Sequence, residues 1–142
     1  MGKLVFLRGT NVWLESFLDQ GEAEQADAFF SPVPAGRSAI MGFSLYSLEV
    51  SLTRLEEAAL PERFLGDAMA SDGVSRVRLG REELRSVPGY REPHGLDFDD
   101  AYQYAAVRNF DLKLVRSDSV FNRTDVKRLE PQEALSMYEK DN

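Results

Sequence analysis

The sequence predicts an α/β fold, a three-layer sandwich in which helices cover both faces of a mostly parallel sheet. Two observations support it. Short apolar runs typical of strands alternate with helical segments along the chain, and the first run is apolar throughout, as in strands buried on both faces. The chain has 142 residues, of which 43% are hydrophobic, so we expect a single domain over residues 1–142.

The first half of the chain is expected to contain two strands and four helices. In the third helix, leucines recur at the spacing of one helical face, and Pro61 occupies a position suited to the first turn of the fourth. The prolines of Ser31–Gly36 indicate a loop between the helix pairs. The expected strands are Lys3–Leu7 and Arg37–Met41, and the expected helices are Asn11–Asp19, Glu22–Phe30, Ser44–Ala59 and Glu62–Ala70.

The second half is expected to alternate in the same way. Its clearest helix is Asp97–Phe110, because Asp97 suits an N-cap, two acids follow it, and alanine is frequent inside. The proline-flanked segment Pro88–Gly95 and the polar segment Ser117–Thr124 are predicted to be loops. The remaining expected strands are Val74–Leu79, Leu112–Val115 and Val126–Leu129, and the remaining helices are Arg81–Val87 and Pro131–Glu139.

The composition of the chain excludes several classes of function. The net charge is −7 and the pI is about 4.8, so the overall field of the protein does not attract nucleic acid. There is no cysteine, which excludes disulfides, thiolate metal sites and thiol catalysis. No apolar run approaches the ~18 residues of a membrane helix, so we expect a cytoplasmic protein without a membrane partner.

Acidic residues stand at two places where a metal site could form, the start of one predicted helix and the end of one predicted strand. Asp97, Asp99 and Asp100 stand at the start of the alanine-rich helix, and Asp118 follows the strand Leu112–Val115. Carboxylates in separate strand-end loops can share Mg²⁺ or Mn²⁺ and support metal-assisted phosphodiester cleavage. The structural alternative is that the first cluster caps a helix and that Asp118 is a turn residue.

Three segments resemble the motifs of one family, the PIN-domain nucleases of bacterial and archaeal toxin–antitoxin systems. The opening strand runs into Thr10-Asn11-Val12-Trp13, similar to the family's strand followed by Asp-Thr-Asn. The stretch 95–105, with an acid ahead of Ala101-Tyr102-Gln103-Tyr104-Ala105, resembles its third motif, and 112–121 resembles its fourth. The likeness spans residues 3 to 129.

The resemblance implies a Rossmann-like α/β/α fold with a parallel sheet of four or five strands. It also implies a Mg²⁺- or Mn²⁺-dependent endoribonuclease, neutralised in many members by an antitoxin and often dimeric. Carried over onto this sequence, Asp100 and Asp118 are metal ligands, Asp99 is a further ligand or a water-orienting group, and Asn11 lies near the scissile phosphate.

The chain departs from the family pattern at several positions. Gly9 and Gly42 stand where the family has two of its acids, and Arg116 stands where threonine is common. Glu15 and Glu49 lie too far along their helices to replace the missing acids well. Because Mg²⁺ is normally held by carboxylates, its binding is expected to be weak or absent, and Arg8 would oppose it further.

Two functions therefore remain open, besides that of an unrelated α/β protein that binds a small molecule. The chain is either a metal-dependent nuclease that cleaves RNA through a weakened site, or a non-catalytic module. The module would bind an antitoxin-like protein or form a homodimer.

Overall fold

The computed structural model of the chain describes residues 3–20, 33–54 and 73–141. The predicted helices Glu22–Phe30 and Glu62–Ala70 lie outside these ranges, as do the ends of several neighbouring predictions. Within the described residues, no helix is long and apolar enough to cross a membrane.

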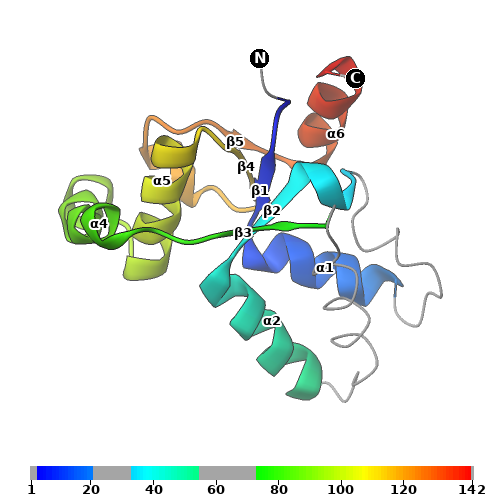
Figure 1. The fold of residues 1–142 in the computed structure, drawn as a ribbon, viewed down its shortest axis with the longest axis horizontal. Coiled ribbons are helices and arrows are strands. Elements are labelled where there is room, and N and C mark those ends of the chain that lie inside the picture. Colours follow the sequence, from blue (N-terminus) through cyan, green and yellow to red (C-terminus); the bar gives the residue numbers. More distant parts are fainter. Residues whose placement is uncertain (1–2, 21–32, 55–72, 142) are drawn as a thin grey trace.

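A five-stranded parallel sheet forms the centre of the molecule (Figure 1), as predicted. Several strands are shorter than their apolar runs, since only residues that pair with a neighbour belong to the ladder. The strand order is β3-β2-β1-β4-β5. The strands are β1 (Phe6–Arg8), β2 (Ser38–Met41), β3 (Ser75–Val77), β4 (Lys113–Val115) and β5 (Arg128–Leu129).

Helices cover both faces of the sheet because successive strand side chains point to opposite sides. Leu7 of β1 and Leu114 of β4 pack beneath α4 (Arg81–His94) and α5 (Phe98–Phe110). Their neighbours Phe6 and Val115 face the other way, in a cluster that includes α1 and α6 residues. On that second face lie α1 (Thr10–Gln20), α2 (Gly42–Arg54) and α6 (Pro131–Asp141). The predicted three-layer sandwich is confirmed.

Helix α4 differs from the prediction. Its helical backbone continues to His94, so the expected loop over Pro88–Gly95 is wrong. Two prolines inside the helix each remove one backbone donor. Packing on α5 offsets this cost, because Val87 is fully buried and the Tyr90 ring packs at a tilt against the Tyr104 ring, with ring centroids 4.9 Å apart. Gly95 ends the helix at a φ of 63°, a left-handed conformation that favours glycine.

Helix α5 begins as its sequence predicts. The Asp97 carboxylate accepts a hydrogen bond of 2.8 Å from the Asp100 backbone N–H, which is the expected N-cap. The helix ends at Phe110, and its C-cap Asp111 has a left-handed φ of 51°. The cap fixes Asp100 at the first turn of α5, facing the carboxyl ends of the central strands.

The chain order creates one crevice at those strand ends. From β1 the chain proceeds outward to β2 and β3, then returns through α4 and α5 to β4 on the other side of β1. Loops that leave β1 and β4 therefore diverge from the same point, the position where open α/β sheets bind ligands. Gly9 follows β1 directly, and Arg116 follows β4.

The end of α6 is tied to the start of β1. Asp141 forms an ion pair with Arg37 and also accepts a hydrogen bond of 3.1 Å from the Leu4 backbone N–H. Arg37 in turn donates from Nε to the Leu4 carbonyl at 2.6 Å. Arg37 is 9% exposed, so its charge depends on these partners.

We expect Asp141→Ala to lower the free energy of unfolding by about 1–2 kcal/mol, because it leaves the largely buried Arg37 cation short of an acceptor. Urea denaturation followed by circular dichroism measures this difference. The matched control is Glu139→Ala, an exposed acid of the same helix, which should change stability by less than about 0.5 kcal/mol. Equal effects of the two substitutions would contradict the role given to Asp141.

Candidate functional site

A cavity of about 680 Å³ lies at the carboxyl ends of β1 and β4. Four of the residues singled out from the sequence line it together, namely Asn11, Asp99, Asp100 and Asp118. Gly9 lines it as well, whereas Gly42 does not, although its neighbour Phe43 does. The other lining residues are Thr10, Val12, Glu15, Ser47, Asp97, Gln103, Arg116, Ser117 and Val120.

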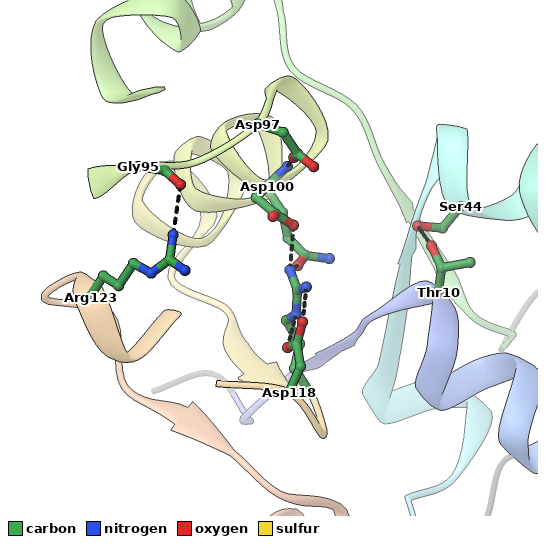
Figure 2. Close-up of polar contacts among 9 residues, drawn as sticks. Thr10, Ser44, Gly95, Asp97, Asp100, Asp118 and Arg123 are labelled. Carbon is green, nitrogen blue, oxygen red and sulfur yellow. Dashed lines mark hydrogen bonds and ion pairs between the residues drawn. The ribbon is translucent and has the colours of Figure 1, made fainter. Parts of the chain in front are cut away.

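Backbone hydrogen bonds fix the floor of this pocket. The Gly9 N–H donates to the Val115 carbonyl at 3.0 Å, which holds the end of β1 against the end of β4. The Gly9 carbonyl then accepts from the Trp13 N–H, the first bond into α1. Beside it, the Thr10 hydroxyl donates to Ser44 Oγ at 2.7 Å and joins the first turns of α1 and α2 (Figure 2).

The Arg116 guanidinium occupies the space between the two best-placed carboxylates. Its Nε and Nη2 atoms donate to Asp118 Oδ1 and Oδ2 at 2.8 and 2.7 Å. Its Nη1 atom donates to Asp100 Oδ1 at 2.7 Å and to Gln103 Oε1 at 3.0 Å. Figure 2 shows Asp100 and Asp118 at opposite ends of this bonded group. A fork that is bidentate to one carboxylate and bonded to a second is a strong arrangement for arginine.

Gly9 lets the arginine side chain pass. A Cβ atom at position 9 would lie 3.2 Å from Arg116 Cγ and 3.6 Å from the Val115 carbonyl oxygen. The first distance is too short for comfortable packing. Gly9 does not have a positive φ, so space is the reason for a glycine here. By contrast, a Cβ at Gly42 would meet nothing within 4 Å.

The pocket carries excess negative charge. Its lining contains five acids (Glu15, Asp97, Asp99, Asp100 and Asp118) and one cation, Arg116, which gives five minus one, a net charge of −4. Burial raises the pKa of the Asp100 carboxyl, and the hydrogen bond and charge of Arg116 work against that rise. The charges of Asp118 and Asp100 in turn raise the pKa of Arg116, against the effect of its own burial.

The residues present do not fit a divalent ion. Among the residues that the structure describes, no group of three His, Cys, Asp or Glu side chains is placed to hold a metal. Both oxygens of Asp118 and one of Asp100 already accept hydrogen bonds from Arg116. A hard dication needs several oxygen ligands around one point, and here a monovalent guanidinium lies there instead.

The structure corrects or extends three expectations about side chains. Arg8 does not face the pocket, because it is 2% exposed and its guanidinium carbon lies 3.7 Å from the centre of the Trp13 ring. Burial lowers the Arg8 pKa to about 9. Glu15 does line the pocket. Gln103 was not anticipated, although its place one turn beyond Asp100 puts it on the same face of α5.

Known proteins share this fold and sequence pattern. The PIN domain family model matches residues 9–127. Similar solved structures include a toxin–antitoxin complex from Klebsiella pneumoniae (17% identity, 88% of this chain and 96% of that chain covered, TM-score 0.64). PAE2754 from Pyrobaculum aerophilum is similar too (14% identity, 96% of this chain and 98% of that chain covered, TM-score 0.66). So is FitAcB from Neisseria gonorrhoeae (16% identity, 90% of this chain and 99% of that chain covered, TM-score 0.62). A comparison with curated proteins found no match.

We expect Arg116→Ala to lower the free energy of unfolding by about 2 kcal/mol at neutral pH, because two adjacent carboxylates lose their common cation. Without Arg116 the Asp100 pKa rises further above its unfolded value. In the variant, the stability that Asp100 contributes is therefore fully present at low pH, where its carboxyl is protonated, and is lost as the pH rises through its pKa in the folded state. The deficit should therefore shrink on acidification.

Denaturation at several pH values measures that deficit, with Arg123→Ala as the control. Arg123 is exposed, and its side chain donates a hydrogen bond of 2.9 Å to the Gly95 carbonyl and has no carboxylate partner among the described residues. A deficit that does not depend on pH would contradict the pairing.

Gly9→Ala should cost about 1 kcal/mol in the native chain, because Arg116 Cγ must move away from the added methyl group. The same substitution in an Arg116→Ala background should cost nearly nothing, which gives a positive coupling in a double-mutant cycle. Gly42→Ala, where the space is open, is the control and should show no coupling. Additive effects of Gly9→Ala and Arg116→Ala would refute the close approach.

Proposed function

Because the chain belongs to the PIN domain family, we propose that it acts as a non-catalytic member that binds a partner protein. The partner presents a basic segment, and the acidic pocket at the ends of β1 and β4 receives it. The observation that carries this proposal is the Arg116 guanidinium bonded to both Asp100 and Asp118.

Metal-assisted cleavage of RNA requires ions that polarise the phosphate and generate hydroxide. Here the two carboxylates best placed to hold an ion are both paired with one cationic side chain of the same protein. No other acid among the described residues completes a three-ligand group with them. The predicted roles of Asp100, Asp118 and Asp99 as metal ligands are thus not part of this proposal. Their role is to set the charge of the pocket.

The charge of the pocket favours protein over RNA. Without a metal ion, a lining of net charge −4 repels phosphates and attracts lysine and arginine side chains. Glu15 and Asp99 give the rim two acids that form no ion pair among the described residues, so they are available to a partner. Asn11 and Ser47 add groups that can donate or accept hydrogen bonds beside them.

The similar structures suggest the kind of partner. One is described as a toxin–antitoxin complex, and another as FitAB bound to a DNA fragment. We propose that the partner of this chain is an antitoxin-like protein. The predicted homodimer is a separate proposal, and its only support among the described residues is the exposure of single large apolar side chains, Leu84 of α4 and Phe98 and Phe110 of α5.

The rival function is a metal-dependent endoribonuclease. It is favoured by one observation, the convergence of Asp100 and Asp118 in a pocket of ample volume. It requires Arg116 to leave both carboxylates when Mg²⁺ or Mn²⁺ binds, and it requires RNA to enter an acidic pocket. It predicts Mn²⁺-dependent cleavage that Asp100→Asn abolishes.

One experiment separates the two functions. The purified chain is mixed with a single-stranded RNA oligonucleotide and Mn²⁺, and separately titrated with a fluorescent oligo-arginine peptide. We expect no cleavage above that of the Asp100→Asn variant, together with saturable peptide binding that weakens as salt is added. Cleavage that Asp100→Asn removes would establish the nuclease and overturn the proposal.

A pair of charge-neutralising substitutions tests whether the peptide binds in this pocket. Glu15→Gln with Asp99→Asn should weaken peptide binding roughly tenfold at low salt, about 1.4 kcal/mol. The control, Glu92→Gln with Glu139→Gln, removes the same net charge from exposed positions outside the pocket lining. Equal weakening in both variants would mean that the peptide binds the protein's general charge and not this pocket.

A further inference from the structure

We infer that Arg116 is the resident cation of this pocket. Its guanidinium takes the place between Asp100 and Asp118 that a divalent ion would need, and Gly9 provides the room for its side chain. The pocket is thereby assembled without metal. This inference concerns the same pocket as the proposed function, but it rests on the isolated chain and does not require a partner.

The arginine is held from several sides. Its backbone N–H donates to the Leu129 carbonyl at 3.0 Å, and its carbonyl accepts from Arg128 Nη1 at 3.2 Å. Its guanidinium carbon lies 4.8 Å from the centre of the Phe121 ring, a residue of the core. Its side chain is only 15% exposed. A side chain fixed along its whole length is an internal component of the fold.

The surroundings of the guanidinium match its donors. Four hydrogen bonds use Nε, Nη1 and Nη2, and Gln103, itself 3% exposed, supplies a neutral acceptor beside Asp100. A planar fork is satisfied by acceptors in one plane, whereas a dication requires oxygens around it in three dimensions. The amide of Gln103 is therefore explained by the arginine.

Close approach at Gly9 links the two positions. An added Cβ would lie 3.2 Å from Arg116 Cγ and 3.8 Å from Arg116 Cδ, with the Val115 carbonyl oxygen at 3.6 Å. Any side chain at position 9 and the arginine at position 116 therefore compete for the same space. Removing the arginine frees a position from which an acid could join Asp100 and Asp118, since all three positions line one cavity.

This competition for space can be tested by thermal unfolding. The Tm is measured for three proteins, namely the native chain, Arg116→Ala and Gly9→Asp/Arg116→Ala. Each is measured after chelation of metal ions and again with MnCl₂, and CaCl₂ and NaCl serve as ionic controls. Isothermal titration with MnCl₂ accompanies it. For the native chain we expect no change in Tm on chelation and no Mn²⁺-specific shift.

For the double variant, the exchange of a cation for an acid creates three converging carboxylates. We expect Mn²⁺ to raise its Tm by at least about 3 °C and to give a saturable heat signal. The control Gly89→Asp/Arg116→Ala adds an acid at an exposed position of α4 outside the cavity lining and should show a much smaller shift. A Mn²⁺ shift in the native chain that Asp100→Asn removes would overturn the inference.

A double variant that fails to fold leaves a second test. Arg116→Lys keeps one positive charge but cannot bridge both carboxylates with a planar fork. We expect it to lose most of the stability that Arg116→Ala loses, and still to bind no Mn²⁺. If Arg116→Lys had the same Tm as the native chain, the guanidinium would not be needed to hold the pocket together, and the inference would be overturned.

Discussion

The pocket depends on one interaction, the bridge that Arg116 makes between Asp118 at the end of β4 and Asp100 in the first turn of α5. The parallel sheet brings these residues together, because the chain crosses back from β3 to place β4 beside β1. The bridge places one positive charge between two partly buried carboxylates that would otherwise repel each other. Gly9, at the end of β1, leaves the space through which the arginine reaches them.

A guanidinium in this pocket supplies different chemistry from a bound metal ion. A metal ion is exchangeable, and it leaves coordination positions open for water and substrate. A guanidinium offers only N–H donors and stays with the chain, so it stabilises the pocket without generating a nucleophile. The remaining acids at the rim keep a negative field over the opening. This field is the basis of the proposal that the pocket receives basic groups of a partner protein.

The layer architecture and the convergence of the acidic residues in one pocket could be predicted from the sequence. Alternating strand and helix patterns indicated the sandwich, because hydrophobic periodicity reports which face of each element is buried. Asp97 indicated the start of α5, because helix capping is a local interaction. The convergence of Asp100 with Asp118 followed from the geometry of parallel strands. The course of α4 beyond Pro88 could not be predicted in this way, since the burial of Val87 and the ring contact of Tyr90 with Tyr104 overcame the local preference of proline. The directions of Arg8 and Arg116 also depend on tertiary contacts that no spacing records.

A crystal structure grown with millimolar MnCl₂ and measured at the manganese absorption edge tests the central claim most directly. The account predicts no anomalous peak in the pocket, with Arg116 still bonded to Asp100, Asp118 and Gln103. A peak between the two aspartates, with the guanidinium displaced, would contradict it.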